Sequence, residues 1–178
     1  MSDSFRQRLL TLGFTLSISL GFDQTTKRIV EHTFGDEPSS YFFDTIRFQF
    51  IKNSGAFLGL GSNYNPNLKL WLFFILPSIF LLGALIYCVV DEKLDSLSRI
   101  MIALMVSGGL GNLIDRIFLA GQVTDFINMG IGPVRTGIFN IADVAIMAGA
   151  FGLLLVHYKC SSQKNPKSKE TNKISTMS

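Results

Sequence analysis

Residues 70–90 form an apolar run of 21 residues without a charged side chain, and this run constrains the fold more than any other feature. About 20 consecutive apolar residues make a helix long enough to cross the hydrocarbon core of a bilayer. Backbone groups at that depth must satisfy their hydrogen bonds internally, which favours helices. The sequence therefore predicts a helical membrane protein.

Three more segments are long and apolar enough to cross a membrane, and they comprise residues 9–30, 100–119 and 136–156. Only 16% of the 178 residues are charged, whereas a soluble domain usually carries about 25%. We therefore expect an all-α membrane protein, a four-transmembrane-helix bundle that forms a single domain over residues 1–160. The polar residues 161–178 are expected to form a disordered basic tail.

The distribution of lysine and arginine indicates how the spans are oriented. Four spans place both termini on one side of the membrane, together with the loop 91–99. Nine basic residues flank the spans on that side, whereas the opposite loops, 31–67 and 120–137, hold three. Because basic residues are enriched on the cytoplasmic side, we expect both termini in the cytoplasm. The basic excess is too diffuse for a nucleic-acid surface, so no nucleic-acid partner is expected.

The polar side chains within these spans all fall at the end that this orientation places outside the cytoplasm. They are Asp23, Lys27, Asn112, Asp115, Arg116, Asn140 and Asp143, and Asp125 follows just after the third span. A charge at the centre of a bilayer costs roughly 2.5–3.5 kcal/mol, so ionisable residues in membrane helices are candidates for function. Polar residues that only join helices would be scattered in depth. We therefore expect one functional site near the extracytoplasmic face.

The residue types at this depth favour one kind of catalysis. Neither the two cysteines, Cys88 and Cys160, nor the two histidines are spaced for a zinc site, and no metal or other cofactor is expected. Two neighbouring carboxylates share a proton, so one can activate water as a base while the other donates a proton. This is the chemistry of aspartic proteases.

Three aspartates compete for the two places in such a pair. Asp115 directly precedes Arg116, and we expect these two residues to form a structural ion pair. Asp125 and Asp143 have no basic neighbour in the sequence and are predicted to be the catalytic dyad. Proton or ion translocation is the alternative function. It predicts acidic residues through the full depth of the bilayer, and the inner halves of the spans have none.

Two features around the first span each have a simpler explanation. Asp23 and Lys27 are four residues apart on one helical face, and a weak ion pair at the membrane interface, with Lys27 reaching the head groups, explains them equally well. Residues 46–50 alternate between apolar and polar types, which predicts a short strand. The small residues at 53–61 permit close approach of the backbone to a neighbour or a ligand, although a plain hairpin turn is the alternative.

Five motifs occur in order along the chain. They are Asp23-x-x-x-Lys27, Asn53-x-Gly55-Ala56-Phe57, Gly111-Asn112-x-x-Asp115-Arg116, Val123-x-Asp125-Phe126 and Phe139-Asn140-x-Ala142-Asp143. With four spans at matching places, the chain resembles bacterial lipoprotein signal peptidase (signal peptidase II) over nearly all of its length before the tail. The family reads Asn-x-Gly-Ala-Ala-Phe in the second motif, and this chain lacks one alanine, so the roles of Ala56 and Phe57 stay open.

The resemblance implies a fold, with a small extracytoplasmic β-cradle around residues 46–62 and a short amphipathic periplasmic segment beside it, in a bacterial inner membrane. It implies an aspartic endopeptidase that removes the signal peptide from prolipoproteins, cleaves before a diacylglyceryl-modified cysteine and is inhibited by cyclic peptides such as globomycin. The dyad is then Asp125 and Asp143, and the supporting positions are Asp23, Lys27, Asn53, Gly55, Asn112, Asp115, Arg116, Asn140 and Ala142. Membrane lipid is an expected partner, and we expect the chain to act as a monomer.

Overall fold

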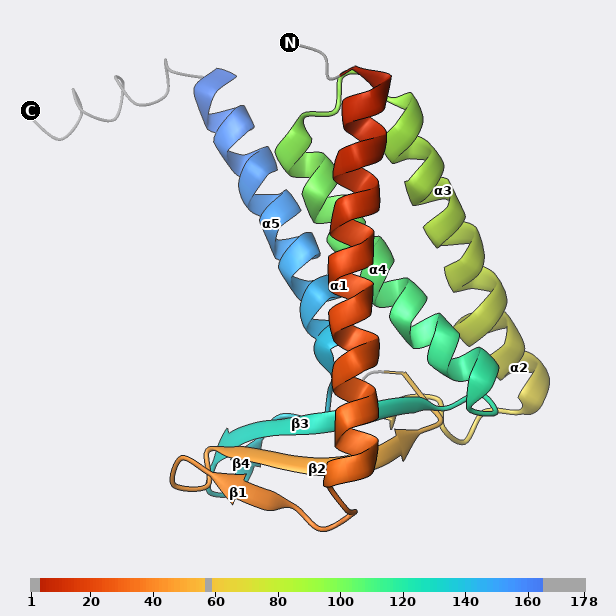
Figure 1. The fold of residues 1–178 in the computed structure, drawn as a ribbon, viewed down its shortest axis with the longest axis vertical. Coiled ribbons are helices and arrows are strands. Elements are labelled where there is room, and N and C mark those ends of the chain that lie inside the picture. The colour runs from red at the N-terminus through yellow and green to blue at the C-terminus, as the bar shows by residue number, and fades with distance from the viewer. Residues whose placement is uncertain (1–3, 57–58, 165–178) are drawn as a thin grey trace, which may run out of the picture.

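A computed structural model describes residues 4–56 and 59–164 (Figure 1). In chain order the elements are α1 (Phe5–Thr33), β1 (Ser39–Tyr41), β2 (Ile46–Asn53), α2 (Pro66–Leu70), the π-helix η2 (Trp71–Ile75), α3 (Leu76–Val90), α4 (Ser96–Phe118), β3 (Val123–Ile131), β4 (Val134–Arg135) and α5 (Ile141–Lys164).

Helix starts are set by local capping residues. The Ser4 side chain accepts a hydrogen bond from the backbone N–H of Gln7, and the Gln7 side chain accepts one from Ser4, which closes a capping box at α1. The side chains of Asn65 and Asp95 cap α2 and α4 in the same way, by accepting a backbone N–H from the first turn. The π-helix η2 ends two residues before Pro77, whose missing N–H interrupts the α-helical hydrogen-bond pattern.

The helices form a bundle in which α4 contacts α1, α3 and α5 (Figure 1). Glycines allow α4 and α5 to approach closely, because a Cβ at Gly108 would collide with the backbone of Ala142 and one at Gly149 with the backbone of Met101. Close packing of this kind fixes the position of α5 against the end of α4, where the polar residues of both helices lie.

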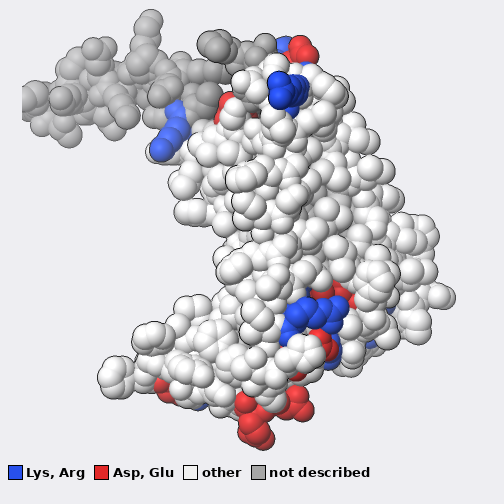
Figure 2. All heavy atoms as spheres, viewed as in Figure 1, with Lys and Arg blue, Asp and Glu red and all other residues white. Residues whose placement is uncertain are grey.

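Three of these helical segments are long and apolar enough to cross a membrane: Pro66–Val90, Ser96–Phe118 and Ile141–Lys159. Helix α1 is also long enough, with 29 residues, but it is less apolar than these three. In Figure 2 charged side chains gather at the two ends of the molecule, and the middle of the visible helical surface carries none. This arrangement is that of a membrane protein.

The strands form one antiparallel sheet in the order β1-β2-β3-β4. Strands β2 and β3 are paired with Asn53 opposite Val123 and Ile51 opposite Asp125, and an irregularity lies between Phe48 and Ile51. The sheet lies across the end of the bundle where α1 ends and α5 begins, and the start of α1 and the end of α5 lie at the opposite end (Figure 1). The sheet therefore covers the ends of the helices that carry the predicted site residues.

The observed helices extend beyond the predicted spans at most of their ends. Helix α1 covers the predicted 9–30 and adds a turn or so at each end, and the segment predicted at 70–90 begins at Pro66. The segment predicted at 136–156 is wrong at its start, because α5 begins only at Ile141. Phe139 instead pairs with Ile127 of β3 as a bridge, which keeps the preceding residues extended.

The sheet is larger than the predicted cradle. The loop predicted at 120–137 contains β3 and β4, and these strands pair with β2 and with each other. The described part of the loop 34–65 contains strands and turns, and the short amphipathic segment beside the cradle stays a prediction. Of the predicted tail, the first residues up to Lys164 continue α5, and residues 165–178 lie outside the described part of the chain, as does Phe57.

Candidate active site

The predicted site residues lie on five separate elements that meet at the junction of bundle and sheet. Asp23 and Lys27 come from α1, Asn53 from the end of β2 with Gly55 just after it, and Asp125 from β3. The rest come from the end of α4 or the start of α5. Each is connected to at least one other by a hydrogen bond or ion pair. The structure thus brings together Asp23, Lys27, Asn53, Gly55, Asn112, Asp115, Arg116, Asp125, Asn140, Ala142 and Asp143.

Asn140 joins the two aspartates that were predicted to form the dyad. Its side-chain amide donates to Oδ1 of Asp125 at 2.6 Å. Its backbone N–H donates to Oδ2 of Asp143 at 3.1 Å, and its side-chain oxygen accepts the backbone N–H of Asp143 at 3.0 Å. One fully buried side chain therefore sets the positions of both carboxyl groups.

The reciprocal bonds between Asn140 and Asp143 are also the cap of α5. Asn140 precedes the first helical residue and Asp143 is the third, which is the spacing of a capping box. Asp23 of α1 adds a further cap, because its Oδ1 accepts the backbone N–H of Ala142 at 2.8 Å. The positive end of the helix dipole favours negative charge on both carboxylates.

Asp125 lies in β3, is almost fully buried, and accepts hydrogen bonds from two amides. Asn53 donates to its Oδ2 at 2.8 Å and Asn140 to its Oδ1. Burial raises the pKa of Asp125 to about 6, and the nearby charge of Asp143 adds to this, whereas the two amides oppose it. A carboxyl group with such a pKa can exchange a proton near neutral pH.

A buried network of charges lies next to the aspartate pair. The Lys27 Nζ is 2.9 Å from Asp23 Oδ2 and 3.0 Å from Asp115 Oδ2, and it donates to Asn112 Oδ1 at 3.1 Å. The explanation of Asp23 and Lys27 as an interfacial pair is wrong, because both side chains are almost completely buried. The predicted pair of Asp115 with Arg116 is also wrong: these neighbours in the sequence point to different partners, and Asp115 binds Lys27 of another helix.

Arg116 points away from Asp115, into the region of the aspartate pair. Its Nη2 donates to the backbone carbonyl of Gly55 at 3.0 Å, and its guanidinium lies 5.3 Å from the centre of the Phe73 ring. A Cβ at Gly55 would lie 2.6 Å from the backbone of Gly59, so the glycine is required by the close approach of two chain segments. Arg116 thereby ties the segment after β2 to α4.

Two hollows meet at Asp125. A cavity of about 310 Å³ contains both carboxyl groups, and it is lined by Asn53, Gly55, Ala56, Asn112, Arg116, Val123, Asp125, Asp143, Ile146 and Met147. A more polar hollow of about 550 Å³ lies over the sheet, and its lining includes Arg47, Lys52, Asn53, Asp125 and Asn128. An extended chain could therefore pass from an apolar pocket between helices to a polar surface, with Asp125 at the boundary.

Sequence reasoning missed two residues of the site. The side-chain amide of Gln24 donates to Asp23, to Asp115 and to the Gly111 carbonyl at 3.1–3.2 Å. Thr124 donates its backbone N–H to Asp115 and accepts from Asn140 with its carbonyl. Gln24 directly follows Asp23 in a predicted span, and a polar residue at that position was a usable signal. The role of Thr124 depends on its backbone, which no residue type reveals.

The carboxylates of the site are bound either by the lysine or by neutral amide side chains. Within the described residues, no group of three or more histidine, cysteine, aspartate or glutamate side chains is arranged to hold a metal ion.

Comparison with known proteins shows which family the chain resembles. The family model described as Signal peptidase (SPase) II matches residues 15–159 of the chain. A "Lipoprotein signal peptidase" from Borrelia turicatae is 35% identical over 150 residues, covering 81% of this chain and 87% of the relative. Another, from Staphylococcus aureus, is 34% identical over 150 residues and covers 82% and 86% of the two chains.

Solved structures share the fold of this chain. Two of them are described as structures of a bacterial membrane enzyme obtained by the in meso method. The one at 2.3 Å resolution has a TM-score of 0.75 and 30% identity and covers 88% of this chain and 93% of its own. The one at 1.9 Å has a TM-score of 0.69 and 27% identity, with coverage of 82% and 91%. The chain therefore belongs to the signal peptidase II family, a family of membrane proteases that process lipoproteins.

Proposed function

We propose that this chain is an aspartic endopeptidase that removes the signal peptide from prolipoproteins by cleaving before a diacylglyceryl-modified cysteine. The names of its relatives supply the substrate class. The observation that carries the mechanism is the bridging Asn140, which binds Asp125 with its side chain and Asp143 with both side chain and backbone. Both carboxyl groups line one cavity of about 310 Å³.

In the proposed reaction Asp125 and Asp143 share one proton. Burial favours the protonated form of Asp125, and the start of α5 favours negative charge on Asp143. Asp143 takes a proton from a water molecule, which attacks the carbonyl carbon of the scissile bond, while Asp125 gives its proton to the carbonyl oxygen. Asp143 then gives its proton to the leaving nitrogen, Asp125 recovers its own, and the peptide bond breaks.

The two hollows support a direction for the substrate. The cavity between the helices is bounded by Ile146 and Met147 and suits the apolar end of a signal peptide. The hollow over the sheet is lined by Arg47, Lys52 and other polar groups and suits the start of the mature chain. Since Asp125 lines both, we propose that the scissile bond lies at their boundary, with the acyl chains of the cysteine in the bilayer.

The proposed topology has four spans, one domain over residues 1–160 and a cytoplasmic tail at 161–178. Helix α1 lies along α4 in the bundle, and its 29 residues give a length of about 43 Å, enough to cross with the others. The distribution of basic residues supports cytoplasmic termini and a site near the extracytoplasmic face of the bacterial inner membrane. We propose that the enzyme acts as a monomer surrounded by lipid, and that globomycin-type cyclic peptides occupy its cavity.

Cleavage of a diacylated prolipoprotein by the purified chain tests this proposal. We expect cleavage that persists with a metal chelator, is blocked by globomycin, and is lost in both Asp125→Asn and Asp143→Asn while the variants stay folded by circular dichroism. Asp36→Asn, which changes an exposed aspartate outside the site, is the matched control and should retain activity. Cleavage by either dyad variant, or loss of cleavage on chelation, would refute the proposed mechanism.

A further inference from the structure

The turn between β1 and β2 has an unusual backbone for its residues. Phe42, Phe43 and Asp44 are consecutive and have positive φ angles of 50°, 55° and 64°. This left-handed region suits glycine and asparagine, and it is unfavourable for bulky residues such as phenylalanine. A chain selected only for stability would place glycine or asparagine here, so the two phenylalanines need another explanation.

Strong polar contacts hold this turn in place. The Asp44 carboxylate accepts bonds from Nε and Nη2 of Arg47 at 2.6 Å each and from the Ser40 hydroxyl at 2.7 Å. Arg135 donates to the Asp44 carbonyl at 2.8 Å, which joins the turn to β4. Hydrogen bonding from Arg47 also holds the pKa of Asp44 well below its usual range. The turn is therefore fixed in its strained conformation at neutral pH.

The phenylalanine side chains gain nothing from the fold in return. Phe42 is 74% exposed and Phe43 fully exposed. The β3–β4 hairpin beside them, joined to the turn by the bond from the Gly130 N–H to the Thr45 carbonyl, exposes Ile131 and Val134 at 78% each. Single exposed apolar residues are common, but an apolar patch of this kind marks an interaction site. We call Phe42, Phe43, Ile131 and Val134 the apolar tip.

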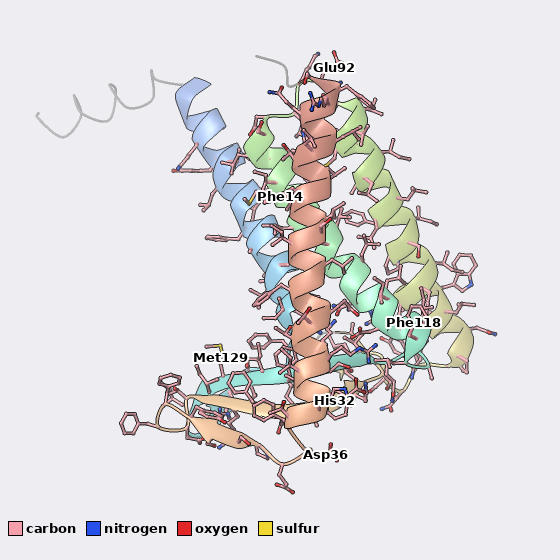
Figure 3. All side chains as sticks on the ribbon, viewed as in Figure 1. Phe14, His32, Asp36, Glu92, Phe118 and Met129 are labelled. Carbon is pink, nitrogen blue, oxygen red and sulfur yellow. The ribbon has the colours of Figure 1, made fainter. Side chains whose placement is uncertain are left out.

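The position of the sheet indicates what covers the apolar tip. The sheet projects sideways past the start of α5, at the level where the apolar helices end (Figure 1). In Figure 2 the surface between the projecting sheet and the helices is hollowed, and its outline shows no charged side chain. Met129 lies on the side of the sheet that faces the helices, and Asp36 on the opposite side (Figure 3). Phenylalanine, leucine and tryptophan side chains on the apolar faces of interfacial segments bury themselves at the boundary between lipid head groups and acyl chains.

We propose that the apolar tip inserts into the lipid head-group region of the leaflet nearest the sheet and anchors the sheet to the membrane. The β3 strand that ends at Ile131 also carries Asp125, so the anchor sets the depth of the Asp125 carboxyl group relative to the bilayer. This inference requires the helices to cross a membrane. It does not require the proposed catalytic dyad, and its tests below do not measure cleavage.

Depth-dependent quenching of a single tryptophan tests the anchor. Trp71 is the only tryptophan of the chain, so the double variant Trp71→Phe/Phe43→Trp has one reporter at the apolar tip, and Trp71→Phe/Asp36→Trp is the matched control on the opposite side. In vesicles of phosphatidylcholine brominated on its acyl chains, we expect several-fold stronger quenching for the reporter at position 43. Equal quenching of the two reporters would overturn the proposal.

A second measurement isolates the phenylalanines. In Trp71→Phe/Ile131→Trp, the added changes Phe42→Gly and Phe43→Gly should reduce quenching by brominated lipid at least twofold, and the thermal midpoint in detergent should stay equal or rise because glycine relieves the positive φ angles. Unchanged quenching, or a lower midpoint, would contradict the anchor. If quenching instead falls as protein density in the vesicle rises, a second copy of the chain covers the tip and the lipid proposal is wrong.

Discussion

At the scale of single residues, the site depends on amides as much as on carboxylates. Asn53 and Asn140 each donate to one oxygen of Asp125, and Asn112 donates to Asp143 at 3.0 Å. An amide group donates without carrying charge, so it orients a carboxylate without fixing its protonation as a lysine or arginine would. The polar residue types around the dyad therefore leave it free to gain and lose a proton.

The pH dependence of catalysis should report the proton held by Asp125. With its pKa raised to about 6, the pair loses the shared proton as pH rises through that value, so kcat/KM should fall on the alkaline side of about pH 6. Asn53→Ala removes a hydrogen bond that lowers the pKa of Asp125. In this variant the pH at which kcat/KM falls should therefore move to a higher value, as measured by kcat/KM across the acid to mildly basic range.

Asn128→Ala is a suitable control for that shift, because Asn128 lines the hollow over the sheet without a bond to Asp125. If the pH at which kcat/KM falls moves equally in both variants, or in neither, Asp125 does not hold the proton that limits the reaction.

The buried carboxylate of Asp115 joins α4 to α1 and to β3 and is expected to stabilise the fold. Its carboxylate binds Lys27 at 3.0 Å, the Thr124 backbone and the Gln24 side chain, and it is nearly fully buried. Asp115→Ala leaves these donors without their partner, which typically costs about 3–5 kcal/mol for a buried pair. We expect a lower free energy of unfolding in detergent, and Asp36→Ala, at an exposed position, should leave it unchanged. An Asp115→Ala protein of full stability but without activity would instead place Asp115 in the catalytic set.

At the scale of elements, the packing of α1, α4 and α5 determines where the capping carboxylate of Asp23 lies. Gly111 of α4 faces this carboxylate, and a Cβ there would lie 2.5 Å from Asp23 Oδ2. Asp23 has little room to move, because its other oxygen accepts the N–H of Ala142 at the start of α5. The absence of a side chain at one position of α4 thus permits a contact between two other helices.

Gly111→Ala should therefore be destabilising, although alanine is the better helix former. We expect displacement of Asp23, a loss of about 1–3 kcal/mol in unfolding free energy and reduced cleavage. Gly13→Ala is the matched control, because a Cβ at Gly13 meets nothing within 4 Å and helix propensity then favours alanine by about 0.5–1 kcal/mol. This explanation would be contradicted if the thermal midpoints of both variants changed in the same direction.

Sequence reasoning predicted individual elements unevenly, for physical reasons. Long apolar runs identified helices within a few residues, because twenty uncharged residues have few alternatives in a membrane protein. Strand β3 was missed because its nine residues show little strict alternation of apolar and polar types, and because Gly130 within it is typical of a loop. The start of α5 was placed too early because residues 136–140 are uncharged. The bridge from Phe139 to Ile127, the bond from Thr136 to Met129 and the cap at Asn140 keep these residues out of the helix.

The sequence predicted that the charged residues lie close together better than it predicted which of them pair with one another. The common depth of the polar residues follows from counting along each helix, and the structure does bring them together. Asp115 and Arg116, however, point to different sides of α4 because neighbours on a helix are about 100° apart, so adjacency in sequence was a poor guide to pairing. The lysine that Asp115 binds lies 88 positions earlier, on a helix whose rotation the sequence leaves open.

At the scale of the whole molecule, the two ends of the bundle differ in chemistry. Arg8 donates to the Val90 carbonyl and Arg99 to the carbonyls of Asp91 and Leu94, so two guanidinium groups satisfy the backbone where α3 ends. Figure 3 shows Glu92 at this end, with His32 and Asp36 at the end next to the sheet. The carboxylate–amide site and the sheet occupy one end, and the arginine-capped loop the other.

Labelling from one side of the membrane tests this polarity and the role of α1. In a Cys160→Ser background, Asp36→Cys should react in intact cells with a thiol reagent that cannot cross the inner membrane. Ser4→Cys and Lys93→Cys should react only after the cells are opened, because four spans place both at the cytoplasmic end. Reaction of Ser4→Cys in intact cells would show that α1 does not cross, whereas the native Cys88 is fully buried and should not contribute.

The hydrogen bonds of Asn140 have a consequence for the order of folding and activity. The same side chain that caps α5 also binds Asp125 of β3. Under the proposed mechanism, a chain whose last helix is not yet docked has two separate aspartates, so proteolytic activity would appear only once α5 has packed against the sheet.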